Sequence, residues 1–461
     1  MTAMDLKGKR VTVVGLGLSG TALARWLAAR GALVGVSEMK PEAGFAPWLL
    51  LNRSYLERTE FGGHTEAFLC SSDLIVASPG VPLFQPALAA AARRGVPVVG
   101  ELEVALSDCR ARIVAVTGTN GKTTTTALLG HLLKVAGVPS TVAGNIGIPV
   151  SQVADSAGAG HVLVLEVSSF QLDTAPSLHP ELAILLNVTP DHLDRYATYD
   201  AYKRSKERIF ANQTPDDVAV LNRRDAVCAD LAPSLAARVR WFDSRLGGME
   251  GAGVEDGWMV VRAGDRERRI MKATELGLRG EHNLENALAA CVVAAELGVG
   301  DSAMAEGLRT FPGVEHRLEA AGSVGQVVFI NDSKATNVDA QEKALASFDE
   351  PVVLIAGGRD KGADFTRLLP LIRKSVKASV LIGEAAGKIR AAWEGAVPLR
   401  DSSSLDEAVA TAYELARPKG LVLLSPGCAS YDMFRNFEDR GRQFREAVSR
   451  LSSTLSQGTK A

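Results

Sequence analysis

The stretch Val114-Ala-Val-Thr-Gly-Thr-Asn-Gly-Lys-Thr-Thr124 decides the fold, because it joins a β-branched strand to a glycine-rich turn and then to a helix. Gly118 and Gly121 have no Cβ, so the backbone N–H groups of the turn are able to close around an anion. Lys122 adds a point charge for the outer phosphates of a nucleotide, and the Thr123 hydroxyl is suited to Mg²⁺. The stretch therefore predicts a nucleoside triphosphate site, formed by Gly118, Thr119, Asn120, Gly121, Lys122, Thr123 and Thr124. The common P-loop has four residues between its first glycine and its Gly-Lys pair, whereas this turn has two.

The composition is that of an ordinary globular protein. The 461 residues are 46% hydrophobic, and the net charge of −2 argues against binding nucleic acid through bulk electrostatics. The five cysteines form no CxxC pair, which favours free thiols in a reducing, cytoplasmic location. No apolar run resembles a signal peptide, and Pro139 and Pro149 interrupt a long uncharged stretch, so we expect no membrane insertion.

Strand and helix patterns divide the chain into three α/β domains, about as many as its length suggests. Residues 1–99 alternate short apolar strands with helices, which predicts a Rossmann-like parallel sheet. Residues 100–312 hold the phosphate loop among doubly buried strands, in a P-loop ATPase-like α/β domain with short antiparallel strands within 236–272. Residues 313–461 repeat the alternation and predict a C-terminal Rossmann-like domain.

A second glycine pattern, Gly15-Leu-Gly-Leu-Ser-Gly20, follows the first predicted strand, and Glu38 ends the next one. By itself this pattern suits NAD, another diphosphate such as a nucleotide sugar, or simple packing of a helix on a strand. The triphosphate loop reduces the weight of the NAD interpretation, because enzymes that combine hydride transfer with ATP chemistry are less common.

Polar residues follow two buried strands of the central domain. Glu166 begins Glu-Val-Ser-Ser-Phe-Gln171, and His192 lies in Asn187-Val-Thr-Pro-Asp-His192. Open α/β sheets bind ligands at the carboxyl ends of their strands, so we expect these side chains to meet the phosphate loop. Together with Thr123 they offer ligands to a Mg²⁺ that bridges ATP and an acceptor. The predicted helix 199–210 carries Lys203 and Lys206, and composition alone does not separate a functional lysine from a solvated one.

These motifs, with Gly144-Asn-Ile-Gly147 and Gly280-Glu-His-Asn283, resemble those of the Mur ligases, the ATP-dependent amide ligases of peptidoglycan synthesis. Further matching motifs are His316-Arg317, Asn331–Asn337, Gly357-Gly358 and Ser425–Glu438, so the resemblance spans nearly the whole chain in order. It implies three domains, ATP with two Mg²⁺ ions, and the small-molecule substrates UDP-N-acetylmuramoyl-L-alanine and D-glutamate. We also expect a monomer.

The resemblance implies a role for each matching residue. Lys122 contacts the phosphates, Glu166 and His192 hold Mg²⁺ beside Thr123, and Lys206 reacts with CO₂ to become a metal-binding carbamate. The other residues implied to bind ATP are Asn283, Asn286, Arg317 and Asp332. Those implied to bind the nucleotide sugar are Leu18, Ser19, Glu38, Ser78, Pro79, Gly80 and Asn145. Those implied to bind D-glutamate are Lys334, Thr336, Lys361, Ser430 and Phe437.

Three positions depart from one known family pattern. Met39 has no hydroxyl for the uracil, and Arg359 precedes Asp360 in a loop where an acidic role is expected. Tyr431 stands where an aliphatic residue can occur, and we expect its larger ring to narrow the amino-acid pocket. The alternatives are a sibling ligase with another amino acid, a folylpolyglutamate synthase, and a regulatory P-loop module. A regulatory module would leave Glu166 and His192 unexplained.

Overall fold

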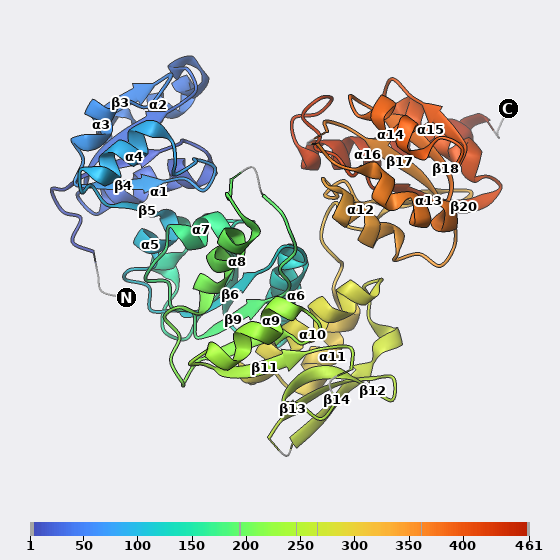
Figure 1. The fold of residues 1–461 in the computed structure, drawn as a ribbon, viewed down its shortest axis with the longest axis horizontal. Coiled ribbons are helices and arrows are strands. Elements are labelled where there is room, and N and C mark those ends of the chain that lie inside the picture. The colour runs from blue at the N-terminus through green and yellow to red at the C-terminus, as the bar shows by residue number, and fades with distance from the viewer. Residues whose placement is uncertain (1–3, 193–194, 246, 265, 361, 459–461) are drawn as a thin grey trace. The chain divides into compact units, whose positions relative to one another are not determined.

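The computed structural model describes residues 4–192, 195–245, 247–264, 266–360 and 362–458, and it contains three sheets, each flanked by helices (Figure 1). The α/β fold of three domains expected from the sequence is confirmed. The chain divides into two compact units, one of Met1–Glu275 with Glu285–Thr310 and one of Leu276–Leu284 with Phe311–Ala461. No helix among the described residues has an apolar stretch long enough to span a bilayer.

The first sheet is wholly parallel, with strands in the order β3-β2-β1-β4-β5. Its strands are β1 (Arg10–Val14), β2 (Leu33–Glu38), β3 (Leu56–Phe61), β4 (Leu74–Ala77) and β5 (Val98–Gly100). Its helices are α1 (Leu18–Ala29), α2 (Ala46–Asn52), α3 (Glu66–Cys70) and α4 (Pro86–Arg93). The sequence pattern missed β3, because four of its six residues are polar or charged and it has no apolar run.

The glycines of Gly15–Gly20 have different structural roles. Gly15 has a φ of +87°, and a Cβ there would lie 2.9 Å from Val81 Cγ2. A Cβ on Gly20 would lie 1.9 Å from the Gly15 carbonyl oxygen, whereas one on Gly17 would meet nothing within 4 Å. Packing therefore requires glycine at 15 and 20, and Gly17 leaves open space at the start of α1.

The second sheet has nine strands in the order β14-β13-β12-β11-β10-β9-β6-β8-β7. Its strands are β6 (Arg112–Thr117), β7 (Ser140–Gly144), β8 (Val162–Glu166), β9 (Leu182–Leu185), β10 (Val218–Asn222), β11 (Arg238–Phe242), β12 (Gly251–Glu255), β13 (Trp258–Ala263) and β14 (Arg266–Lys272). Its helices are α5 (Glu101–Ala105), α6 (Lys122–Val135), α7 (Ser169–Asp173), α8 (Tyr199–Glu207), α9 (Ala226–Leu231), α10 (Glu281–Glu296) and α11 (Asp301–Thr310).

The prediction of antiparallel strands throughout 236–272 was wrong for β11. This strand pairs in parallel with β10 and with β12. Within this region only the β12–β13 and β13–β14 pairs are antiparallel. The reason is that β10, Val218–Asn222, is fully buried and continues the parallel sheet, which the sequence interpretation did not include. Asp256 and Gly257 take positive φ values of 50° and 78° between β12 and β13, as a tight hairpin requires.

The third sheet has the order β15-β16-β20-β17-β18-β19, and only β15 is antiparallel to its neighbour. Its strands are β15 (Glu319–Val324), β16 (Gln326–Asn331), β17 (Val352–Gly357), β18 (Val376–Ile382), β19 (Leu399–Asp401) and β20 (Lys419–Leu424). Its helices are α12 (Val338–Leu345), α13 (Leu369–Ser375), α14 (Ala386–Trp393), α15 (Leu405–Ala416) and α16 (Phe437–Gly458). The carboxyl ends of β16, β17 and β20 carry the polar motifs of this domain.

Substitution of Gly20 by alanine is expected to destabilise the first domain by about 3 kcal/mol, because the new Cβ overlaps the Gly15 carbonyl. Gly17→Ala is the matched control, with an expected loss under about 1 kcal/mol, because its Cβ enters open space. Hydrogen exchange of the β1 and β2 amides measures both effects. Equal protection in the two variants would contradict this packing role of Gly20.

Candidate active site

The phosphate loop has the strand–turn–helix form that its sequence predicts. Gly121, at the N-cap of α6, has a φ of +88°, and no side chain caps the helix there. A Cβ on Gly121 would lie 2.3 Å from Asn286 Oδ1, so Asn286 of α10 lies against the loop as expected of an ATP-binding residue. Lys122 Nζ donates to the carbonyl oxygens of Gly118 and Thr119, both at 2.9 Å. The helix N-terminus and this lysine together make an anion site.

The loop is tied to the segment that carries His192. Thr119 Oγ1 donates to the Thr189 carbonyl at 3.1 Å and accepts from the Thr189 N–H at 3.0 Å. The Asn187 side chain accepts from the Asn120 N–H at 2.8 Å and donates to the Asn120 carbonyl at 3.1 Å. These paired hydrogen bonds hold the phosphate loop and the His192 segment in register at the carboxyl ends of β6 and β9.

Glu166 has an oxygen suited to a cation. Its side chain is 2% exposed at the end of β8, and Oε1 accepts from Asn145 Nδ2 at 2.8 Å. Oε2 is buried and has no hydrogen-bond partner among the described residues. A buried carboxylate oxygen is rarely left unsatisfied, and a divalent cation is a natural partner for it.

Lys206 is buried rather than a solvated surface charge. Its side chain is 2% exposed, and Nζ donates to the Gly118 carbonyl at 2.8 Å and lies 4.7 Å from the centre of the Tyr202 ring. Burial, and then the charge of Lys122, hold the pKa of the Lys206 amine well below its usual value. Lys203 on the same helix instead forms a surface pair with Glu207 at 3.8 Å.

Aromatic rings surround His192. Its backbone has a φ of +53°, and its ring meets Phe170 edge-on at a centroid distance of 5.0 Å. Phe170 stacks on Tyr196 at 5.8 Å, and the Tyr196 hydroxyl donates to Asp173 at 2.7 Å. Tyr202 bonds to Thr119 through its hydroxyl at 3.0 Å. No sequence signal marked these tyrosines, since Tyr202 lies in a helical pattern, where a tyrosine is usually a core residue, and Tyr196 lies in no motif.

Among the described residues, no group of three or more His, Cys, Asp or Glu side chains is arranged to hold a metal ion. Glu166 and His192 are therefore not part of such a group. Thr123, buried at the start of α6, and Lys206 lie outside those residue types.

Most of the residues that the resemblance implies for the nucleotide sugar lie at or after the carboxyl ends of β1, β2 and β4, whereas Asn145 follows β7 of the central domain. Glu38 accepts from the Leu16 N–H at 2.6 Å and from the Lys40 N–H at 3.0 Å, so it holds the glycine loop in place. Ser78 Oγ donates to the Gly15 carbonyl at 2.8 Å, which joins the loop after β4 to the same turn. Leu18 is 82% exposed beside this turn. Ser19 and Pro79 are half-buried, and Gly80 is exposed.

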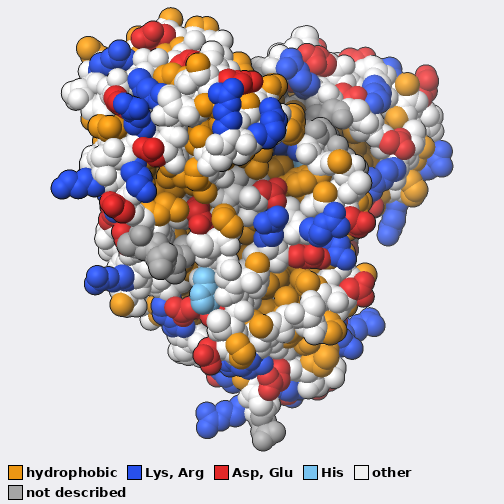
Figure 2. All heavy atoms as spheres, turned by 60° about the vertical axis from the view of Figure 1, so that its left-hand side comes forward, with side chains coloured by type: hydrophobic (Ala, Val, Ile, Leu, Met, Phe, Trp, Pro, Cys, Tyr) orange, Lys and Arg blue, Asp and Glu red, His pale blue; other side chains and the backbone are white. Residues whose placement is uncertain are grey.

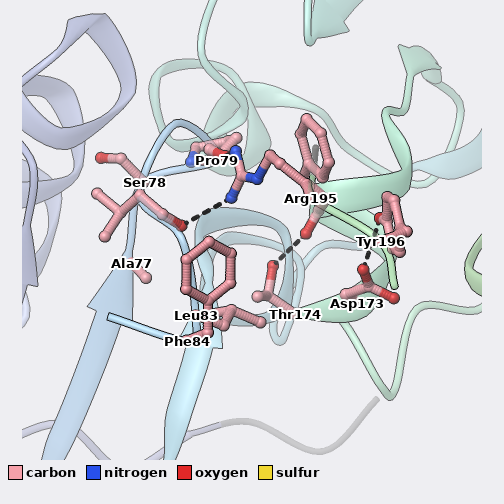
Figure 3. Close-up of a pocket in the computed structure, with 11 residues that line it drawn as sticks. Ala77, Ser78, Pro79, Leu83, Phe84, Asp173, Thr174, Arg195 and Tyr196 are labelled. Carbon is pink, nitrogen blue, oxygen red and sulfur yellow. Dashed lines mark hydrogen bonds between the residues drawn. The ribbon is translucent and has the colours of Figure 1, made fainter. Parts of the chain in front are cut away.

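A cavity of about 230 Å³ lies between the first sheet's Ser78 loop and the central domain (Figure 3). The residues that line it from the first domain are Ala77, Ser78, Pro79, Val81, Leu83 and Phe84. Those from the central domain are Phe170, Asp173, Thr174, Arg195 and Tyr196. The Arg195 guanidinium points from the central domain to the Ser78–Pro79 loop (Figure 3).

The second compact unit carries the remaining residues that the resemblance implies for ATP, Asn283, Arg317 and Asp332. Asp332 is buried at the end of β16 and accepts from Ser425 Oγ at 2.9 Å and from the Leu318 N–H at 3.3 Å. Burial raises the pKa of Asp332 to about 7, against the lowering effect of Arg317. Arg317 Nε is buried without a hydrogen-bond partner in the described part of the chain. Asn283 Nδ2 donates to the Arg279 carbonyl at 2.7 Å.

The structure brings Lys334 and Phe437 together, with Lys334 Nζ 5.5 Å from the ring centre. Thr336 is half-buried, Ser430 is buried, and Lys361 lies outside the described residues. Arg440 was missed by the sequence analysis. It is fully buried, and it donates from Nε to Ser333 Oγ at 2.9 Å and from Nη1 to the Cys428 carbonyl at 3.2 Å.

Arg440 therefore ties the loop after β16, which carries Lys334 and Thr336, to the loop after β20, which carries Ser430. A helix arginine is usually solvated, so no signal in the sequence distinguished this one. Of the two departures in this unit, Tyr431 is 63% exposed, and Arg359 pairs with Glu384 at 3.1 Å. On the face shown in Figure 2, acidic and basic side chains are interspersed, as the net charge suggests.

Family models match three consecutive parts of the chain. They are "Mur ligase MurD-like, N-terminal domain" at residues 9–100, "Mur ligase middle domain" at 116–294 and "Mur ligase, glutamate ligase domain" at 316–428.

Similar proteins include the UDP-N-acetylmuramoylalanine–D-glutamate ligases of Pelotomaculum thermopropionicum and Salinibacter ruber, each 45% identical to this chain. The alignment with the first ligase covers 96% of this chain and 98% of that ligase. The alignment with the second covers 98% of this chain and all of that ligase. Among solved structures, MurC from Thermotoga maritima is similar with a TM-score of 0.60 at 21% identity, covering 97% of this chain and all of that one. A pseudomurein peptide ligase from Methanothermus fervidus has a TM-score of 0.58 at 17% identity, covering 96% of this chain and all of that one. At these identities the two structures show a shared fold.

Asp332→Asn is expected to remove a loss of stability that the second unit undergoes as the pH rises. The unfolded carboxyl ionises near pH 4 and the folded one near pH 7, so its contribution is present below pH 4 and is lost as the pH rises through 7. Asparagine does not titrate, and it is able to accept from Leu318 and donate to Ser425. We expect the variant to gain about 1–4 kcal/mol over the parent between pH 4 and pH 8.

Hydrogen exchange of the β16 and β20 amides measures this difference within the unit. Parallel pH curves for the parent and the variant would mean that the Asp332 carboxyl ionises normally in the folded state.

Proposed function

Because this chain belongs to the Mur ligase family, we propose that it uses ATP to join D-glutamate to UDP-N-acetylmuramoyl-L-alanine. The observation that carries this proposal is the meeting of the phosphate loop, Glu166 and Lys206 at one edge of the central sheet. Relatives at 45% identity over nearly the full length bear the name of the D-glutamate ligase, which supports the choice of acceptor.

The residues present fit a divalent cation, since Glu166 Oε2 is buried and lacks a hydrogen-bond partner among the described side chains. We propose that Thr123, Glu166, His192 and a carbamate formed on Lys206 hold two Mg²⁺ ions. When bound, these ions would neutralise charge between the triphosphate and the substrate carboxylate. Addition of CO₂ needs an uncharged amine, and the burial of Lys206 favours that form.

The reaction has two steps in this proposal. The L-alanine carboxylate oxygen attacks the γ-phosphorus of ATP, and the bond from this phosphorus to the β-γ bridging oxygen breaks. ADP departs, and the L-alanine carboxylate becomes an acyl phosphate. The D-glutamate amine then attacks the acyl carbon, loses a proton, and the tetrahedral intermediate expels phosphate to give the amide. Lys122 and the α6 N-terminus offset the negative charge brought together in the first step.

The two other substrate sites follow the family pattern. Glu38 and Ser78 shape the turn around Gly17, where open space at the start of α1 suits a diphosphate. Lys334 provides a positive charge beside Phe437 for a D-glutamate carboxylate. Arg317, with an unsatisfied Nε, is suited to the phosphates of ATP.

We propose domain boundaries of 1–99, 100–312 and 313–461, which the ranges of the three family models support. We also propose that the enzyme acts as a monomer in the cytoplasm, where ATP and nucleotide sugars are available.

Phosphate release from Mg²⁺–ATP is expected to require both UDP-N-acetylmuramoyl-L-alanine and D-glutamate. The comparison uses D-glutamate, L-glutamate, L-alanine and L-lysine, each with and without the nucleotide sugar. Release with a different amino acid would assign the chain to a sibling ligase, and release indifferent to every acceptor would favour a regulatory nucleotide-binding module.

Lys206→Arg is expected to lower kcat at least about 100-fold, because a guanidinium forms no carbamate and leaves a charge beside Lys122. Lys203→Arg is the matched control on the same helix and keeps its surface pair with Glu207. In the parent protein, ¹³C-bicarbonate should give a carbamate carbon signal that the Lys206 variant lacks. An unchanged rate in CO₂-depleted buffer with no such signal would refute the carbamate.

A further inference from the structure

Arg195 connects two domains that supply different parts of the active site. Its backbone N–H donates to the His192 carbonyl at 2.9 Å, so its position follows that of the His192 segment. Its side chain extends to the first domain, where Nη2 donates to the Val81 carbonyl at 3.1 Å and Nη1 to the Pro79 carbonyl at 3.4 Å (Figure 3). One side chain therefore reaches from the His192 segment to the turn that follows β4.

The guanidinium is held in place by a ring from a third segment. The Arg195 Cζ lies 3.9 Å from the centre of the Phe170 ring, and Phe170 is edge-on to His192. Phe170 follows Glu166 in the chain by four residues. A planar guanidinium that stacks on an aromatic ring is already restricted, so it loses little further conformational freedom when it donates hydrogen bonds. Its two terminal N–H groups are therefore well suited to two carbonyls of one turn.

Among the described residues, the other hydrogen bonds of the turn that Arg195 contacts come from its own domain. The Val81 N–H donates to the Ser78 carbonyl at 2.9 Å, and Ser78 Oγ donates to Gly15 at 2.8 Å. These bonds set the shape of residues 78–81, but they do not set their distance from the central domain. The Arg195 hydrogen bonds supply that second constraint.

We infer that Arg195 is a positioning residue that keeps the Ser78–Val81 turn in register with the Glu166 and His192 segments. A nucleotide sugar held by the first domain must present its distant carboxylate to the phosphate loop, and an error of about 1 Å there is costly. This inference rests on the proposed binding of the nucleotide sugar at Ser78–Gly80.

Arg195 is not needed merely to keep the two domains attached. Trp26 Nε1 of α1 donates to Asp155 of the central domain at 3.2 Å, and the Arg30 guanidinium of the first domain donates to the same carboxylate. These contacts do not involve Arg195, so we expect them to remain when Arg195 is substituted. A displaced Ser78–Val81 turn can therefore be distinguished from an unfolded protein.

The test compares three variants of the full chain. Arg195→Met keeps the length of the stem but removes the donors, and Arg195→Lys keeps one charged donor without the fork. Arg204→Met is the control, because Arg204 is exposed on α8. Each variant is measured by hydrogen exchange of residues 78–84 without ligand, by thermal unfolding, and by steady-state kinetics.

We expect faster exchange of 78–84 in Arg195→Met, with kcat lowered about 10- to 100-fold and KM for ATP within about twofold of the parent. Arg195→Lys should lie between the parent and Arg195→Met, and Arg204→Met should match the parent. If Arg195→Met exchanges and turns over like the parent, or loses stability while kcat is kept, Arg195 has only a packing role.

A separate measurement tests the premise. In the parent protein, UDP-N-acetylmuramoyl-L-alanine should slow exchange at residues 78–80. Absence of that protection would refute the substrate assignment of this turn, whereas protection in the parent with no effect of Arg195→Met would refute the positioning role alone.

Discussion

The central interaction of this protein is the convergence of two lysine amines on one backbone carbonyl. The Gly118 oxygen accepts from Lys122 at 2.9 Å and from Lys206 at 2.8 Å. Lys122 belongs to the phosphate loop, whereas Lys206 arrives from a helix more than eighty residues later. Burial is the main cause that lowers the pKa of the Lys206 amine, and repulsion by the nearby charge of Lys122 lowers it further. The arrangement is understandable in a site built for a triphosphate and a carboxylate.

The rest of the central domain maintains this convergence. Thr119 is bonded to Thr189 and Tyr202, so the phosphate loop, the His192 segment and α8 are connected through one hydroxyl. Strained backbone accompanies the connection at His192, a non-glycine residue with a φ of +53°, whereas Gly121 takes its positive φ without strain. Strain and unsatisfied polar atoms such as Glu166 Oε2 are common where a protein is organised for a ligand rather than for its own stability.

In the second unit, too, a buried polar side chain connects separate loops, and the residue there is Arg440. Arg440 is fully buried and donates to Ser333 and Cys428, which holds the ends of β16 and β20 together. Asp332 and His316 lie nearby and are also buried, and the Asn331 amide contacts His316 Nδ1 at 3.0 Å. Polar side chains buried this deeply contribute little net stability, but they specify the geometry of the loops that surround a ligand.

Local sequence determined the parts of this protein that depend on neighbouring residues. The strand, glycine turn and helix around Gly118–Thr124 were predictable, because loop geometry follows from where a Cβ is absent. Many buried strands were predictable from apolar runs, but the fully buried β10 was missed. Strand β3 was also missed, because four of its six residues are polar or charged, and so was the parallel pairing of β11.

Only the tertiary structure decided which lysine of α8 is buried, that Glu38 accepts two backbone N–H groups, and that Arg195 and Arg440 bridge separate loops. Burial and long-range hydrogen bonds depend on distances between segments far apart in the chain. An arginine or lysine has the same local pattern on a solvated face as in a packed site, so its role is fixed only when the sheets bring those segments together.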